Sequence, residues 1–314
     1  MMAFPGRLFI ALMLVIFVSG ISCSTYKRLY PDTTIERAVV NKTSKPWAVK
    51  VDYNPPEYSK PCISIDKCDV SAWACCFAFN KYGHSVDRRS ATFGRYKVNS
   101  KCEPLNPRGR TGIRGRGSLL RYGPNHIVVV IISRNGNPLQ YVSKISHGQH
   151  AFEEFPWQFT DNPKMTKLPV KLENVIREDL RKHYPESTVD EIIEKAKKKR
   201  RLVYHGYYHD ERNTDNAWIE SLIYEIRDPD SKGLGLMTLQ GDNAMNLTWK
   251  TADLEGLETK IETIINQARL TKREKLAHQL SELLQNTRPT DASILLDMVG
   301  NVVNLVGIGA SFNG

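Results

Sequence analysis

The residues best suited to bind an anion are concentrated in one stretch, Asn106–His126, with the sequence NPRGRTGIRGRGSLLRYGPNH. Five arginines and five glycines alternate through it. Arginine offers a planar fork of donors that suits phosphate, and glycine lets the backbone adopt positive φ and approach a ligand closely. The stretch therefore predicts an anion cradle, with Arg114 and Arg116 as ligand-binding residues. The alternative is a solvated basic loop that contacts RNA through charge alone.

The segment that follows favours folded structure. The stretch runs directly into Ile127–Ile132, a block of β-branched residues that is typical of a buried strand. A charged loop that leads into a core strand belongs to a folded domain rather than to a disordered tail.

Two long motifs carry a family resemblance. The stretch Asn106–His126 resembles the signature that precedes the catalytic domain of mitochondrial-type ADP-ribose pyrophosphatases, a branch of the Nudix hydrolases. It is equally similar to the Nudix domain of the melastatin-type ADP-ribose-gated TRP channel. A second block, Gly206–Trp218 (GYYHDERNTDNAW), is similar to the family's GY-x-x-D-x-RNTDNAW segment. Shorter matches, Lys45–Trp47 and Gly241–Ala244, fall in the family's order.

The resemblance implies both a fold and a binding site. The fold class is α/β (α+β): a Nudix α/β/α sandwich preceded by a loop-rich, disulfide-containing N-terminal domain. Asp210 and Arg212 would hold the ribose and phosphate region of ADP-ribose, with Asp215 and Asn216 in the same pocket. The alternative for this block is an Asx-rich turn before a strand.

The catalytic element of the family is altered here. The Nudix core R-E-U-x-E-E, where U is a bulky aliphatic residue, places carboxylates on one helix face, where they can chelate Mg²⁺ or Mn²⁺. Aligned on Leu172, the last two acidic positions become Glu178 and Asp179, which are the catalytic and metal-ligand candidates. The first core glutamate becomes Val175 and the upstream one Thr166. Loss of carboxylates weakens a site for a hard cation.

The catalytic element is altered, whereas the two long motifs still match the family. This contrast favours a protein that recognises ADP-ribose or a related nucleotide diphosphate, with impaired or lost hydrolysis. One alternative is an active ADP-ribose diphosphatase that uses Mg²⁺ or Mn²⁺ at an atypical site and yields AMP and ribose 5-phosphate. The other is an interaction module that binds polyanions or membrane through its net charge of +10, without specific nucleic-acid recognition. The chain contains no G-x-S-x-G, HExxH or P-loop motif, which excludes the serine hydrolase, zincin and Walker-type readings.

The N-terminus predicts a secreted protein. The apolar run Leu8–Val18 follows Arg7 and precedes small residues, as in a signal peptide, which we place at residues 1–22. All six cysteines lie before residue 103, which favours disulfides over a zinc site. Two glycosylation sequons begin at Asn41 and Asn246.

The remaining pattern divides the chain into three parts. We expect an N-terminal domain over 23–124, a Nudix-like domain over 125–272 and a C-terminal helix with an apolar tail over 273–314. With 314 residues, 41% of them hydrophobic, the chain can build a proper core. Strands are expected at 73–79, 127–132, 139–142, 202–208 and 217–226, and helices at 171–183, 188–201 and 254–285, the second of these opened by a capping box of Thr188 and Glu191.

Overall fold

The computed structural model describes residues 26–64, 67–71, 78–83, 85–145, 148, 150–163, 168–240 and 242–266. The chain divides into two compact units, Met1–Thr271 and Lys272–Gly314, and all described residues belong to the first. Among them, no helix combines the length and hydropathy that a membrane-spanning segment needs. The predicted signal peptide, the strand core at 72–77 and the apolar tail lie outside the described residues.

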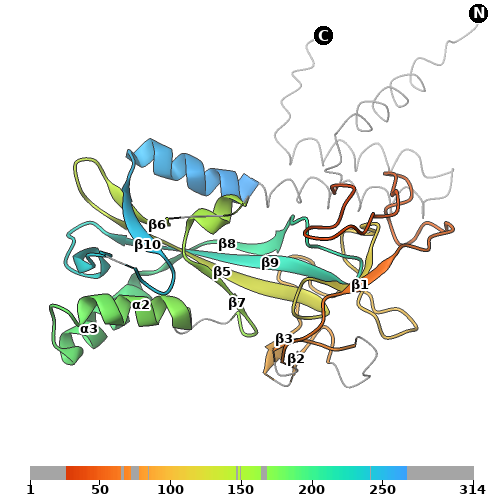
Figure 1. Cartoon of the computed structure of the whole chain (residues 1–314), viewed down its shortest axis with the longest axis horizontal. Helices are drawn as coiled ribbons and strands as arrows, with labels where there is room; N and C mark the ends of the chain where they lie inside the picture. Colours follow the sequence, from red (N-terminus) through yellow and green to blue (C-terminus); the bar gives the residue numbers. More distant parts are fainter. Residues whose placement is uncertain are drawn as a thin grey trace, which may run out of the picture. The chain divides into compact units, whose positions relative to one another are not determined.

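A six-stranded mixed sheet forms the centre of the described fold (Figure 1). The strands follow the order β10-β6-β5-β9-β8, and β7 also pairs with β5. Only β5 and β9 are parallel to each other, and every other pair in this sheet is antiparallel. The bounds are β5 (Gly123–Arg134), β6 (Gln140–Lys144), β7 (Trp157–Thr160), β8 (Arg201–Tyr208), β9 (Ala217–Asp228) and β10 (Leu247–Thr251).

Helical elements cover both faces of this sheet, so the expected α/β/α sandwich is confirmed. The helices α2 (Val170–Leu180) and α3 (Glu186–Lys199) lie on one face with η2 (Leu234–Leu236). Residues 254–266 form a helix on the opposite face, together with η1 (Ala151–Glu154). Figure 1 shows these two layers, green and blue, on either side of the strands.

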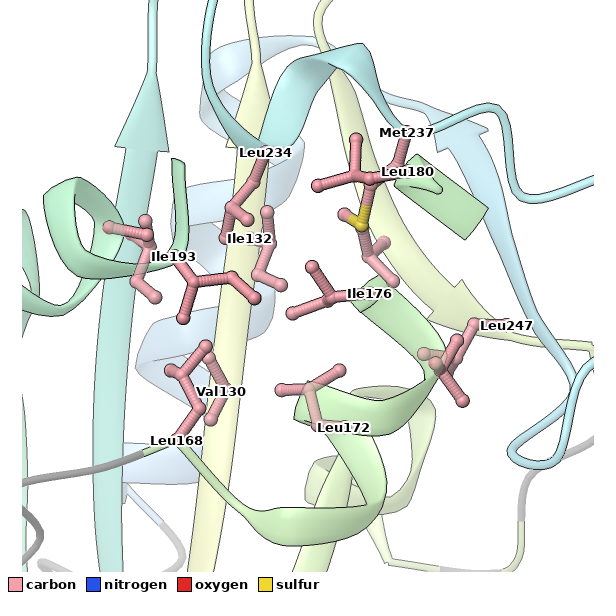
Figure 2. Packing of buried hydrophobic residues seen from close by; sticks show 14 of the residues in the cluster. Val130, Ile132, Leu168, Leu172, Ile176, Leu180, Ile193, Leu234, Met237 and Leu247 are labelled. Atoms are coloured by element: carbon pink, nitrogen blue, oxygen red, sulfur yellow. The ribbon is translucent and has the colours of Figure 1, made fainter. Parts of the chain in front are cut away.

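The central strand β5 explains why two helical layers are needed. Its side chains alternate between the faces, with Val128, Val130 and Ile132 in the cluster under α2 and α3. Ile127, Val129 and Ile131 belong to the cluster under helix 254–266. A strand buried on both faces reads as a continuous apolar run, which is the pattern that marked this segment in the sequence. Figure 2 shows how side chains of α2 and α3 pack against β5.

The expected strands at 127–132, 139–142, 202–208 and 217–226 correspond to β5, β6, β8 and β9. The predicted capping box of Thr188 is wrong, because α3 already begins at Glu186, with Pro185 at the N-cap position and no side-chain cap. Proline fixes φ near the helical value, and it disfavours helical geometry in the residue before it. The helix α2 ends at Leu180, earlier than the predicted 183, and residues 181–183 form a turn.

The N-terminal part is loop-rich, as expected, and contains four short strands. β1 (Glu57–Ser59) pairs in parallel with β4 (Arg114–Gly117), and β2 (Tyr82–Gly83) pairs with β3 (Val86–Asp87). A disulfide joins Cys62 to Cys68, which confirms the expected disulfide. The predicted domain boundary at residue 124 falls inside β5.

The first prediction concerns the core under α2. Ile176 is fully buried in this cluster, so Ile176→Ala should lower the free energy of unfolding by about 2–5 kcal/mol through lost burial and a cavity. Val170 lies on the same helix but is 69% exposed, so Val170→Ala should change it by less than about 0.5 kcal/mol. Urea denaturation measures both. Equal effects of the two variants would contradict this packing.

Candidate ligand-binding site

The arginines of the stretch Asn106–His126 make many contacts with the protein's own backbone. Arg110 donates hydrogen bonds to three carbonyl oxygens of segment 44–49, at 2.6 to 3.0 Å. Arg116 is 2% exposed and donates to the carbonyl oxygens of Lys60, Asp69 and Leu119. Arg114 is partly exposed and forms an ion pair with Glu57 at 2.8 Å. These contacts hold loops together, and ligand binding by Arg114 and Arg116 stays a prediction.

The glycines of the stretch allow the N-terminal segment to approach closely. Gly112 has φ +87°, and a Cβ there would lie 2.4 Å from the carbonyl oxygen of Ala38. Gly117 has φ +64°, and a Cβ would lie 2.2 Å from the Tyr30 hydroxyl. A side chain at either position would clash as well as strain the backbone. The close approach that these glycines permit is to other parts of the protein.

Asp215 and Asn216 join the second motif to this stretch. One carboxylate oxygen of Asp215 accepts hydrogen bonds from the Thr111 amide at 2.6 Å and hydroxyl at 2.8 Å. The other oxygen accepts from the Tyr53 hydroxyl at 2.6 Å. The Asn216 side chain accepts from the Gly115 amide at 2.8 Å. Both residues are at most 3% exposed, so they act as structural connectors within the fold.

Asp210 and Arg212 form a fork beside these connectors. Arg212 donates from Nε to Oδ1 and from Nη2 to Oδ2 of Asp210, at 2.7 Å each. The Asp210 side chain is completely buried, and its burial opposes ionisation, but the hydrogen bonds and charge of Arg212 bring its pKa below the ordinary value. His150 Nε2 lies 3.5 Å from Asp210 Oδ2. The Arg212 guanidinium is thereby fixed over Phe159, 6.0 Å from the ring centroid.

A small pocket, with room for about one water molecule, lies beside Phe159 at the start of β5. Its lining includes Arg121, His126, Phe159 and Asp161. The Arg121 guanidinium bridges Asp161 at 2.8 Å and Asp69 at 3.2 Å. The pocket therefore brings together the end of the arginine-rich stretch and strand β7, which carries Phe159. In sequence, β7 comes shortly before the altered Nudix box.

His126 is the polar group of this pocket that lacks a full set of partners. It is 3% exposed, and its Nε2 lies 3.0 Å from the carbonyl oxygen of Asp87. Burial lowers the pKa of His126 to about 4, so the ring is neutral near pH 7. Because Nε2 donates to a carbonyl, Nδ1 carries the lone pair, and it has no hydrogen-bond partner among the described residues. A water molecule in this small pocket would satisfy it.

The two acidic residues of the altered box have different surroundings. Glu178 is exposed on α2. Asp179 is 5% exposed and accepts hydrogen bonds from the amide and hydroxyl of Thr238 and from the Leu239 amide, at 2.7 to 3.1 Å. Val175 at the first glutamate position packs in the core. Within the described ranges, no three His, Cys, Asp or Glu side chains are grouped to hold a metal ion. This donor set does not fit a Mg²⁺ site.

Sequence reasoning named Asp210 and Arg212, and the structure brings them together. It missed His126 and Phe159 as site residues. His126 closes the Gly-Pro-Asn-His end of the arginine-rich stretch, so its place beside the motif was the available signal. Phe159 gave no signal, because an aromatic residue on a short strand is most often a core residue.

Comparisons with known proteins identify the family. The model of the NUDT9-like N-terminal domain matches residues 40–123. Nudix hydrolase 6 of Caenorhabditis elegans is 30% identical over 241 residues, covering 72% of this chain and 87% of that protein. The mitochondrial ADP-ribose pyrophosphatase of Rattus norvegicus is 31% identical over 247 residues, covering 70% and 69%.

The fold and these matches define a Nudix-type protein. The chain belongs to the Nudix hydrolase family, in the branch that resembles the ADP-ribose pyrophosphatases. Transient receptor potential cation channel subfamily M member 2 of Mus musculus is 32% identical over 241 residues, which cover 70% of this chain. The chain spans only 15% of the length of that channel and 16% of the related channel of Nematostella vectensis.

The second prediction concerns Asp215. Burial raises the pKa of this carboxyl from the ordinary 3.8 to about 6, although hydrogen bonds from Tyr53 and Thr111 oppose the shift. The folded state thus holds the proton more tightly than the unfolded state, and stability is lost as pH rises through this range. The free energy of unfolding of wild type, relative to Asp215→Asn, should fall by about 2 kcal/mol between pH 4 and pH 6.

Urea denaturation of both proteins at several pH values measures this difference. Asparagine has nearly the same shape but does not ionise, so subtracting its profile removes the effect of all other titrating groups. Above about pH 7 the difference should be nearly constant. A difference that does not change between pH 4 and pH 6 would contradict the assigned environment of Asp215.

Proposed function

We propose that this protein recognises ADP-ribose or a related nucleotide diphosphate and that its hydrolytic activity is impaired or lost. The observation that carries the proposal is the fixed guanidinium of Arg212, which is held by Asp210, lies over Phe159 and remains 19% exposed. The name of the rat pyrophosphatase supports the choice of ligand.

Arg212 suits the diphosphate. Its Nε and Nη2 donate to Asp210, which leaves the Nη1 end without a hydrogen bond among the described residues. Its side chain is 19% exposed, so a ligand can reach it while much of the surrounding water is excluded. Charge-assisted hydrogen bonds from guanidinium to phosphate are strong, and more so where solvent is excluded.

The pocket at His126 is too small for a nucleoside. It has room for about one water molecule, which the Nδ1 lone pair of His126 can bind. Phe159 lines this pocket, and its ring centroid lies 6.0 Å from the Arg212 guanidinium, so it offers an apolar surface next to the proposed diphosphate position.

The same geometry argues against efficient hydrolysis. Family enzymes rely on box carboxylates, yet Asp179 is used to hold the backbone at Thr238 and Leu239. Glu178 alone cannot supply the several oxygen ligands that a catalytic Mg²⁺ needs from protein. Binding therefore depends on residues that are present, whereas the chemical step depends on residues that are changed.

The third prediction tests binding. ADP-ribose should raise the melting temperature of wild type, and Arg212→Lys should weaken its affinity by roughly 10-fold or more, because lysine keeps the charge but loses the fork. Arg28→Ala removes an exposed arginine and should leave the affinity unchanged. Thermal shift and calorimetric titration measure both effects. Equal affinity in wild type and Arg212→Lys would remove Arg212 from the site.

The fourth prediction tests hydrolysis. Purified protein incubated with ADP-ribose and Mg²⁺ or Mn²⁺ should yield no more AMP than its Glu178→Gln variant does. Chromatographic product analysis measures AMP directly. Metal-dependent AMP formation that disappears in Glu178→Gln would instead establish an active diphosphatase with an atypical metal site, the alternative that the sequence leaves open.

A further inference from the structure

The sequon Asn41-Lys42-Thr43 lies on an exposed turn. All three residues are exposed, and the Ser44 amide donates to the Asn41 carbonyl oxygen at 3.1 Å, which closes the turn. The Ser44 hydroxyl also accepts a hydrogen bond from the Asn41 amide and donates one to the Asn41 carbonyl oxygen. These contacts use only the backbone of Asn41, so its side-chain amide makes no hydrogen bond among the described residues.

The base of this turn is held firmly. Arg110 donates to the carbonyl oxygens of Ser44 and Pro46 at 2.6 Å each, directly after the sequon. The turn therefore projects from a fixed support with its acceptor side chain in solvent. Val39, two residues before the sequon, is 89% exposed and would be shielded by a sugar chain at Asn41.

The second sequon, Asn246-Leu247-Thr248, has different surroundings. Asn246 adopts a positive φ of 52°, and its backbone bonds to Asn243 and Ile145. Leu247 is 1% exposed, and Thr248 pairs with Ser143 within the ladder of β10 and β6. A transferase must bind the whole Asn-x-Thr segment, and here two of its three residues belong to a folded strand. In the folded protein the Asn246 side chain is exposed, but the sheet holds the two residues that follow it.

We propose that Asn41, and not Asn246, carries an N-linked oligosaccharide. The proposal requires passage through the secretory pathway, which the predicted signal peptide indicates and the Cys62–Cys68 disulfide supports, because such bonds form in oxidising compartments. No residue of the Asn41 sequon lines the pocket at His126, so the sugar leaves ligand binding unobstructed. The modification is thus independent of the proposed function.

The test uses the full chain, with its own N-terminus, expressed in cultured mammalian cells. The protein from medium and lysate is treated with peptide N-glycosidase, which releases the sugar and converts its asparagine to aspartate, and peptides are mapped by mass spectrometry. We expect this conversion at Asn41 and a faster-migrating band after treatment. Thr43→Ala should abolish both, while Thr43→Ser, which keeps the sequon, should retain both.

Asn246→Gln serves as the matched control and should leave the band shift unchanged. Thermal unfolding of the two Thr43 variants should match wild type, because Thr43 is exposed. Unmodified Asn41 in the wild-type chain would overturn the proposal. A shift that survives in Thr43→Ala but disappears in Asn246→Gln would overturn it as well.

Discussion

The buried carboxylate of Asp215 is the constraint on which the rest of the described structure depends. It accepts three hydrogen bonds from Thr111 and Tyr53, which belong to parts of the chain far from it in sequence. Burial of a carboxylate is unfavourable unless such bonds compensate for lost water. The next residue, Asn216, accepts from the Gly115 amide through its side chain and from the Gly123 amide through its carbonyl oxygen, where β5 begins. One turn thereby aligns β5 with β9.

This joint also positions the candidate site. Arg212 lies three residues before Asp215, and His126 lies three residues beyond Gly123, so the same connections fix Arg212 and the small pocket at His126. The two motifs that resemble the ADP-ribose pyrophosphatases therefore combine two kinds of residue. Some, such as Asp215, build the scaffold, and others, such as Arg212, face the space that a ligand would occupy.

Much of this fold could be predicted from sequence, because its central strands carry strong local signals. The β-branched run of β5 and the apolar pattern of β9 were sufficient. The short strands β7 and β10 were missed, since four or five half-buried residues show no clear alternation. Apart from Leu119, the partners of Arg110 and Arg116 could not be predicted, because backbone carbonyl groups about 50 residues or more away leave no mark on the local sequence.

The most direct test of this account is a crystal structure of the protein with ADP-ribose. The account predicts electron density for the diphosphate at the Arg212 guanidinium, with Asp215 still bonded to Thr111. Density for the ligand elsewhere, or a diphosphate bound by Arg116 after its release from the carbonyl groups, would contradict it.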